Sequence, residues 1–451
     1  MNILYAAAEV APYSKVGGLA DVAASLPKAL RALGHDARVI APAHGPVKGT
    51  PAGVAKLPAL GGEELVSYRQ VEENVYLVVN EKYFGDRQVY GEPDDLLRYH
   101  LFTLAVLEAP RVLGWKPDVI NCSDWHTGWL PLGLRNRAWE DQHYRGIASA
   151  LTVHNLAYRG PDSLSDILGP AIYYADVVNT VSPTYAREIT TSGDGFGLEG
   201  LLRLREDRLY GILNGIDCEV YDPANDAALA ATFTSETVER RAENKAALQR
   251  QIGLADEPGT PLVAMVSRLD SQKGLDLVLD VIDQAVPGMQ LAFLGSGAAE
   301  YAEGLRDAMT RHPGRVGAEF GFRADLSPLF YGGADLFLMP SRFEPCGLGQ
   351  LIAMRYGAVP VVRKTGGLAD TVADVSPDLS EGTGFVFEAY DPGALLEALR
   401  RAASAYREEG PASAGSWGRL VQRAMRQDFS WEGSAKLYEQ MYADAIHGLS
   451  P

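Results

Sequence analysis

Glycine-bearing polar turns follow two short apolar runs near the middle of the second half of the chain. The runs, residues 334–339 and 359–362, have the composition of strands buried on both faces of a parallel sheet. The first turn reads S-R-F-E-P-C-G-L and the second K-T-G-G-L. Open α/β sheets bind ligands at the carboxyl ends of their strands, and glycine N–H groups beside cations bind anions. This half of the chain is therefore predicted to bind a phosphate-bearing ligand.

Two more cations, Arg268 and Lys273, follow the apolar run 262–266 in the sequence S-R-L-D-S-Q-K-G. Arginine offers a planar fork for two phosphate oxygens, and lysine offers a point charge. Together they could neutralise a diphosphate leaving group. The alternative is a solvated surface loop, but a second glycine turn at residues 295–297 favours the phosphate site.

A related turn, Lys15-Val16-Gly17-Gly18-Leu19, follows a first predicted strand at residues 2–7. It shares the pattern K-x-G-G-L with residues 364–368, and both copies continue with Ala-Asp and a helical pattern. A helix amino terminus, two glycines and a lysine could hold a diphosphate. A plain strand-to-helix turn or a chance repeat is the alternative, and the second copy favours function.

Asp124 and His154 each follow a predicted strand in the first half of the chain, in the sequences D-W-H and H-N. A carboxylate and an imidazole at the ends of successive strands could contact the hydroxyls of a sugar. Taken singly, a histidine or aspartate at a strand end is more often structural. Asn214 precedes a glycine, a pair that is typical of a turn.

The elements that must position these residues alternate between strand and helix, which predicts βαβ units and parallel sheets. The predicted strands are residues 2–7, 37–41, 75–79, 118–122, 149–153, 177–181 and 210–213, followed by 262–266, 290–294, 316–320, 336–339 and 359–362. The alternation of strands and helices stops after Asp222 and resumes after a charged helix at 235–253. We therefore expect domains at 1–222 and 223–427. An amphipathic helix near 433–446, within a last segment 428–451, could cap the second domain or return to the first.

Composition excludes several classes of protein. The net charge of −17 over 451 residues argues against a nucleic-acid-binding surface. No apolar run is long enough to span a membrane. Three scattered cysteines indicate a reducing, cytoplasmic location rather than a disulfide framework. The motifs of zinc proteases, P-loop ATPases and serine hydrolases are not found, so these three classes are not indicated.

Taken together, these motifs resemble bacterial glycogen synthases and plant starch synthases, which are retaining glycosyltransferases of the GT-B architecture. The resemblance spans nearly the whole chain. The matching blocks are residues 15–21, 124–126, 154–156, 181–186, 214–217, 267–275, 341–348 and 364–370.

The resemblance implies an α/β protein with two Rossmann-like domains whose parallel sheets face a deep cleft, and a last helix that returns to the first domain. It implies transfer of glucose from ADP-glucose to the non-reducing end of an α-1,4-glucan, with retention and with neither a metal nor a cofactor. The implied catalytic residues are Asp124, His154, Arg268, Lys273 and Glu344. The implied donor-binding residues are Lys15, Gly17, Gly18, Asn214, Phe322, Cys346, Gly347, Leu348, Thr365, Gly366 and Gly367. Phe322 replaces a tyrosine that the family stacks on adenine.

Two positions depart from the pattern of retaining relatives. Ile352 stands where many of them carry a second glutamate, as expected in this subfamily. The segment 158–176 is shorter than in typical glycogen synthases, which carry an acceptor-side insertion there. A glucosyltransferase acting on a small acceptor, and a non-catalytic glucan-binding protein, therefore stay open as alternatives. Neither the choice between ADP-glucose and UDP-glucose nor the oligomeric state follows from the sequence.

Overall fold

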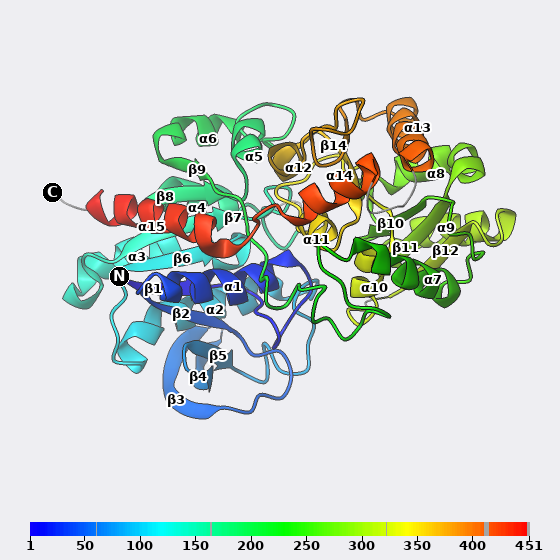
Figure 1. The fold of residues 1–451 in the computed structure, drawn as a ribbon. Helices are drawn as coiled ribbons and strands as arrows, with labels where there is room; N and C mark the ends of the chain where they lie inside the picture. Colours follow the sequence, from blue (N-terminus) through cyan, green and yellow to red (C-terminus); the bar gives the residue numbers. More distant parts are fainter. Residues whose placement is uncertain (60, 163–164, 322, 410–414, 449–451) are drawn as a thin grey trace. The chain divides into compact units, whose positions relative to one another are not determined.

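The computed structural model describes residues 1–59, 61–162, 165–321, 323–409 and 415–448 (Figure 1). Its internal contacts divide the chain into two units. Unit 1 comprises Met1–Gly215 with Ser430–Pro451, and unit 2 comprises Ile216–Phe429. Each unit is an α/β structure built on one large sheet.

The sheet of unit 1 has the strand order β3-β4-β5-β2-β1-β6-β7-β8-β9. Its parallel strands are β1 (Asn2–Ala6), β2 (Asp36–Pro42), β5 (Val75–Val79), β6 (Val119–Ser123), β7 (Ala148–Val153), β8 (Val177–Thr180) and β9 (Leu209–Gly211). The chain leaves β1 toward β2 on one side and later returns to β6 on the other. Ligands of open α/β sheets bind at such a reversal of strand order, beyond the carboxyl ends of the strands.

The first two strands of this order are an antiparallel hairpin that the sequence analysis missed. It consists of β3 (Thr50–Ala59) and β4 (Gly62–Glu72), and β4 also pairs antiparallel with β5. The predicted parallel sheet of unit 1 therefore carries an antiparallel edge that the sequence analysis did not predict. The sequence of β3, T-P-A-G-V-A-K-L-P-A, contains two prolines and a glycine, which are poor strand formers. An edge strand tolerates them because half of its backbone groups need no partner.

The sheet of unit 2 is parallel throughout and has the order β12-β11-β10-β13-β14-β15. Its strands are β10 (Leu262–Val266), β11 (Gln290–Gly295), β12 (Val316–Phe320), β13 (Leu336–Met339), β14 (Val359–Arg363) and β15 (Phe385–Phe387). All but the short β15 were predicted: β10, β12 and β13 have the predicted ends, and β11 and β14 each extend one residue further. The strand order reverses between β10 and β13, so the loops after these two strands are neighbours.

Helices connect the strands in both units. Unit 1 contains α1 (Gly18–Ala32), α2 (Asp95–Val112), α3 (Leu130–Glu140), α4 (Leu168–Tyr174), α5 (Pro183–Glu188), α6 (Glu199–Leu204) and α15 (Trp431–His447). Unit 2 contains α7 (Arg241–Gln251), α8 (Leu275–Ala285), α9 (Ala299–Arg311), α10 (Ser327–Gly333), α11 (Gly349–Arg355), α12 (Gly366–Thr371), α13 (Pro392–Glu409) and α14 (Ser416–Met425). Helix α8 shows why they form: its apolar residues recur at helical spacing and are the ones it buries. No helix in the described ranges is both long and apolar enough to cross a membrane.

The C-terminal helix α15 belongs to unit 1, where it packs beside α1 (Figure 1). Two of its buried tyrosines bond to the sheet: Tyr438 accepts from Asn179 of β8 at 2.8 Å, and Tyr442 donates to Asn121 of β6 at 3.0 Å. The unit boundary falls after Gly215 rather than after residue 222. The residues that follow it, beginning with Ile216, join the hydrophobic core of unit 2.

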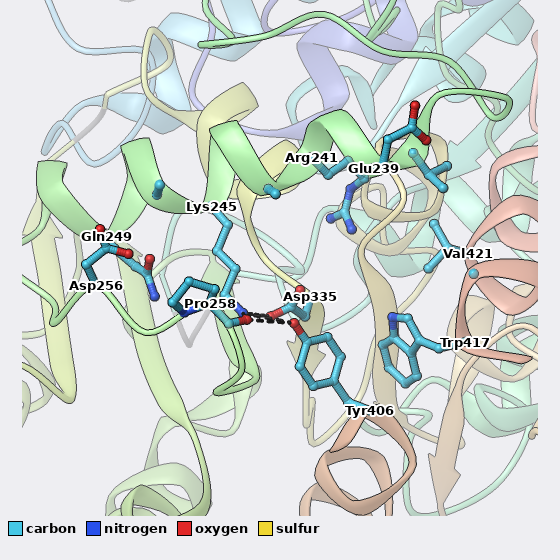
Figure 2. Close-up of a pocket in the computed structure, with 14 residues that line it drawn as sticks. Glu239, Arg241, Lys245, Gln249, Asp256, Pro258, Asp335, Tyr406, Trp417 and Val421 are labelled. Carbon is cyan, nitrogen blue, oxygen red and sulfur yellow. Dashed lines mark hydrogen bonds and ion pairs between the residues drawn. The ribbon is translucent and has the colours of Figure 1, made fainter. Parts of the chain in front are cut away.

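A polar cluster stabilises unit 2 at the amino ends of β10 and β13, where a pocket lies (Figure 2). The buried Lys245 of α7 is 2.6 Å from Asp335, and its ammonium group also donates to the hydroxyl of Tyr406 and to the carbonyls of Pro258 and Thr260. Because Lys245 is surrounded by oxygens of its own chain, we assign this pocket a structural role. It lies at the edge of the sheet opposite to the predicted ligand-binding loops.

Candidate functional site

The loops after β10 and β13 meet through an ion pair between two predicted catalytic residues. The ammonium nitrogen of Lys273 lies 2.6 Å from Oε2 of Glu344, and the hydroxyl of Ser341 donates to the same oxygen at 2.9 Å. The side chain of Glu344 is 6% exposed and that of Lys273 is 18% exposed. The pair is therefore largely screened from water, which strengthens its electrostatic interaction. Lysine retains further N–H donors for an anion.

Arg268 lies on the same loop as Lys273. Its guanidinium is 3.1 Å from Oδ2 of Asp270 and donates to the side chain of Gln272 at 3.1 Å. Asp270 also accepts from the backbone N–H of Lys273 at 3.0 Å, which caps the short helical turn at Ser271–Lys273. The side chain of Arg268 is 47% exposed, so a ligand can reach it.

The glycines at residues 295 and 297 pack beneath this loop. A Cβ atom on Gly295 would lie 1.9 Å from the carbonyl oxygen of Ser267, and one on Gly297 would lie 2.3 Å from that of Leu269. The backbone of Leu269 bonds to Ser296 at 2.8 Å. We infer that these glycines are needed for close packing, which fixes the backbone on either side of Arg268.

The second K-x-G-G-L turn packs against the turn that contains Glu344. The N–H of Gly367 donates to the carbonyl of Glu344 at 3.1 Å. Gly366 has a φ of +44°, and a Cβ there would lie 1.9 Å from the same carbonyl. A Cβ on Gly367 would lie 2.1 Å from the carbonyl of Cys346. Both glycines are therefore required by this contact.

The structure thus brings most of the predicted unit 2 residues to one edge of the sheet. They are Arg268, Lys273, Glu344, Cys346, Gly347, Leu348, Thr365, Gly366 and Gly367. Gln350 of α11 fixes part of this edge by donating to the carbonyls of Cys346 and Gly347, at 3.1 and 2.9 Å. Phe322 lies outside the described residues.

In unit 1, a carboxylate occupies the turn predicted to hold a phosphate. Oε2 of Glu9 accepts the backbone N–H groups of Val16 at 2.5 Å and of Gly17 at 3.3 Å. Burial raises the pKa of Glu9 to about 7, although these N–H bonds oppose the rise. Lys15 forms an ion pair with Asp21 at 2.7 Å, and Gly18 begins α1. The sequence analysis missed Glu9 as a site residue, although an acid within an apolar segment was a visible signal.

Asp124 and His154 are brought together at the ends of β6 and β7. Oδ1 of Asp124 accepts the backbone N–H of His154 at 2.7 Å. Burial raises the pKa of Asp124 to about 7 and lowers that of His154 to about 4, so the imidazole is neutral at physiological pH. Asp124 adopts a φ of +56°, an unusual conformation for a residue other than glycine. Nε2 of His154 is buried and has no hydrogen-bond partner among the described residues.

An aromatic group adjoins these residues. The rings of Tyr90 and Tyr99 each lie 4.7 Å from that of His126, and the ring of Trp125 lies 4.1 Å from it. Asn214 is buried, and its Oδ1 has no partner within the described part of the chain. Over the same residues, no cluster of three or more histidine, cysteine or acidic side chains could hold a metal ion.

Comparison with known proteins shows to which family this chain belongs. The starch synthase catalytic domain family matches residues 2–204, and the family of group 1 glycosyl transferases matches residues 249–411. Glycogen synthase from Geotalea daltonii is 42% identical over 480 residues, which cover 98% of both chains. Glycogen synthase from Geobacillus stearothermophilus is 42% identical over 484 residues, with 99% and 98% covered. The chain belongs to the glycogen synthase family.

Membership of the glycogen synthase family agrees with the tertiary structure. The catalytic domain of starch synthase IV from Arabidopsis thaliana, bound to ADP and acarbose, has a TM-score of 0.88 at 33% identity, with 99% of both chains covered. Sucrose-phosphate synthase from Thermosynechococcus elongatus, at 19% identity and a TM-score of 0.63, shares the fold. The predicted GT-B fold and the predicted family are both confirmed. The alignments exceed the 451 residues of this chain, so its relatives carry residues that it lacks.

Proposed function

We propose that this protein is a glycogen synthase that transfers glucose from ADP-glucose to the non-reducing end of an α-1,4-glucan, with retention of configuration and release of ADP. The observation that carries the proposal is the pairing of Lys273 with Glu344, beside Arg268, where the strand order of unit 2 reverses. Family membership supplies the reaction class. We also propose a cytoplasmic location, from the three scattered cysteines.

The chemistry follows from where charge develops. The bond between the anomeric carbon and the diphosphate oxygen breaks, and that oxygen gains negative charge. Lys273 and Arg268 lie on the same loop, which Asp270 holds by contacts to both residues, so they can stabilise the charge without reorganisation. A hydroxyl oxygen of the glucan then bonds to the anomeric carbon on the same face. Its proton passes to the departing phosphate oxygen, which restores the balance of charge.

Glu344 has two roles in this proposal. Its buried carboxylate holds Lys273 in place before the donor arrives, and its second oxygen is available to orient a hydroxyl of the donor. Thr365, Gly366 and Gly367 are proposed to lie near the phosphates, and Cys346, Gly347 and Leu348 to contact glucose through their backbone. The assignment of Phe322 to adenine stays a prediction.

Residues of unit 1 are proposed to recognise glucose. Neutral His154 can donate one hydrogen bond to a sugar hydroxyl without introducing a charge, and Asp124 fixes its backbone. Lys15, Gly17 and Gly18 are proposed to contact the donor, and Asn214 to contribute its buried amide. No metal is required in this scheme, because lysine and arginine neutralise the diphosphate.

A coupled assay of ADP release tests the proposal. Release from ADP-glucose that depends on glycogen supports it. Release with maltose but not with glycogen would favour the small-acceptor alternative, which the short segment 158–176 and the longer alignments of the relatives keep open. Absence of release with any donor would indicate a non-catalytic glucan-binding protein. Parallel reactions with UDP-glucose determine the base, and EDTA should leave the rate unchanged.

A further inference from the structure

We infer that Glu9 is a positioning residue that holds the turn of Lys15, Gly17 and Gly18 in its donor-binding shape. The inference rests on the proposed function, because that turn is proposed to contact ADP-glucose. Glu9 itself does not need to touch the donor. It acts through the backbone of the turn.

The contacts of Glu9 support this role. Its Oε2 accepts the N–H groups of both Val16 and Gly17, which are the groups that a bound phosphate would otherwise use. Its side chain is buried, so the acceptor of both bonds is shielded from water, while Val16 and Gly17 themselves lie at the surface. The turn therefore has an internal anion that fixes its shape before any ligand binds. Lys15, on the same turn, has its ammonium group at the surface beside Asp21.

Glu9 is also hydrogen-bonded to the side chain of Tyr90. Tyr90 belongs to the loop between β5 and α2, and its ring also contacts His126 at 4.7 Å. Val89, the residue before Tyr90, is held by Tyr99 of α2, whose hydroxyl donates to the carbonyl of Val89 at 2.5 Å. Tyr90 is therefore fixed by packing and by its chain neighbour.

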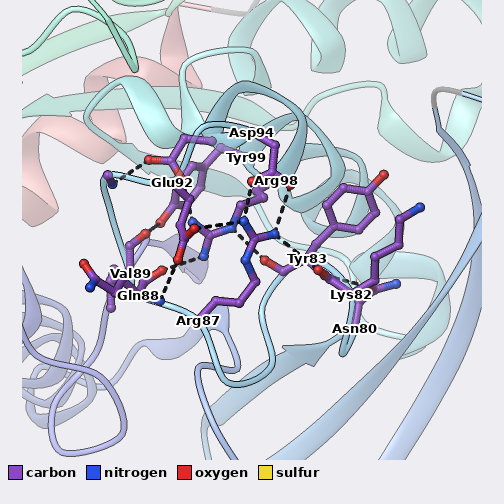
Figure 3. A network of polar contacts seen from close by, with 12 residues as sticks. Asn80, Lys82, Tyr83, Arg87, Gln88, Val89, Glu92, Asp94, Arg98 and Tyr99 are labelled. Carbon is purple, nitrogen blue, oxygen red and sulfur yellow. Dashed lines mark hydrogen bonds and ion pairs between the residues drawn. The ribbon is translucent and has the colours of Figure 1, made fainter.

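The loop that carries Tyr90 is organised by the fully buried Arg98 (Figure 3). Its guanidinium donates to the carbonyl of Tyr83 at 2.6 Å and to that of Gln88 at 2.7 Å. It also pairs with Asp95 at 2.5 Å, and the second carboxylate oxygen of Asp95 accepts the N–H of Gly91 at 2.8 Å. The contacts of Arg98 and Asp95 bracket Tyr90 on both sides in sequence. Arg98 and Asp95 thus fix the backbone on both sides of Tyr90, and Tyr90 in turn bonds to Glu9.

Substitution of Glu9 tests the inference in the full-length enzyme. Glu9→Ala removes the oxygen that accepts both N–H groups, so the KM for ADP-glucose should rise roughly tenfold, the effect of one or two lost hydrogen bonds, while kcat changes less. Glu9→Gln should restore a KM near that of the wild type, because an amide oxygen accepts the same two N–H groups. Glu73→Ala, at an exposed position between β4 and β5, is the matched control and should behave as wild type.

Hydrogen exchange gives a readout that does not depend on activity. Peptides covering residues 13–19 should exchange faster in Glu9→Ala than in the wild type and in Glu9→Gln. Tyr90→Phe, which keeps the ring against His126 and removes only the hydroxyl, should produce a smaller shift in both measurements. It also provides the test if Glu9→Ala does not fold.

Three results would overturn the inference. An unchanged KM and unchanged exchange in Glu9→Ala would remove Glu9 from the positioning of the turn. Equal defects in Glu9→Gln and Glu9→Ala would indicate that the carboxylate acts on the substrate directly. Faster exchange together with an unchanged KM would show that the shape of the turn does not matter for the donor. If the wild type releases no ADP, the proposed function fails, and the exchange data alone decide whether Glu9 holds the turn.

Discussion

Nζ of Lys273 and Oε2 of Glu344 lie 2.6 Å apart although the two residues are 71 positions apart in the chain. They meet because β10 and β13 are adjacent in the sheet, and each residue lies in the loop that follows its strand. The pair therefore depends on the strand order of unit 2. It also makes the two residues thermodynamically coupled.

Lys273→Ala should reduce kcat by about 10²–10³-fold, the usual effect of removing one preorganised charge from a transition state. The same change leaves the carboxylate of Glu344 largely buried without its cation, so the free energy of unfolding should fall by about 2 kcal/mol. Steady-state kinetics and urea unfolding measure the two effects. Lys436→Ala, which breaks an exposed pair on α15, is the control and should change stability by less than about 0.5 kcal/mol. Equal kinetics in both variants would remove Lys273 from the reaction.

The two K-x-G-G-L turns should differ in how strongly an alanine substitution destabilises the protein. Gly366, the counterpart of Gly17, has a φ of +44°, and a Cβ there would lie 1.9 Å from the carbonyl oxygen of Glu344, so Gly366→Ala should destabilise unit 2 by about 2 kcal/mol or more. A Cβ on Gly17 would meet only an oxygen of Glu9 at 3.7 Å, so Gly17→Ala should unfold at nearly the wild-type temperature. Differential scanning calorimetry of the two variants measures this. Equal melting temperatures would contradict the packing difference described for the two turns.

Asp124 should make the protein less stable as pH rises toward neutrality. Its pKa is raised to about 7 in the folded state from an ordinary value of 3.8, so between these values the folded protein holds a proton that the unfolded chain has released. Stability from this group is therefore full below about pH 4, falls up to about pH 7 and is level above it.

Asp124→Asn does not titrate, and its amide oxygen can still accept from His154. The loss of unfolding free energy between pH 5 and pH 8 should therefore be smaller in this variant than in the wild type, by roughly 2 kcal/mol. Urea unfolding at the two pH values measures it. Glu9 contributes with the same sign in both proteins, since its pKa is also raised. If the unfolding free energies of the two proteins changed equally with pH, the raised pKa of the buried Asp124 would be contradicted.

Substitutions of Gly215 and Gly433 should change the stability of the protein in opposite directions. A Cβ on Gly215 would lie 2.8 Å from the backbone of Trp431, so Gly215→Val should displace the start of α15 and lower the melting temperature. Gly433 lies inside α15 with open space around it, so Gly433→Ala should stabilise the helix by about 0.5–1 kcal/mol. Thermal unfolding of both variants, with limited proteolysis near residue 430, separates the outcomes. An unaffected Gly215→Val protein would show that the helix start can shift freely.

Much of the fold could be predicted because its signals are local. The buried parallel strands are continuous apolar runs, so strands such as β10 and β13 were visible in the chain. The hairpin of β3 and β4 was not, because its prolines and glycines oppose strand formation and only its pairing with β5 and its packing against α2 stabilise it. The place of α15 could not be chosen, since an amphipathic helix shows that it has a partner surface but not which one.

For the site, residue types and spacing determined the chemistry: cations and glycines after parallel strands indicate phosphate binding, and the ordered motifs indicate the family. Tertiary structure alone decided the pairings. The two K-x-G-G-L turns are similar in sequence but differ in their packing. Gly366 and Gly367 pack against the backbone of Glu344 and Cys346, whereas Gly17 lies beside the carboxylate of Glu9. Sequence patterns report local backbone preference and burial, but hydrogen bonds between distant residues depend on which strands become neighbours, and only the folded sheet determines that.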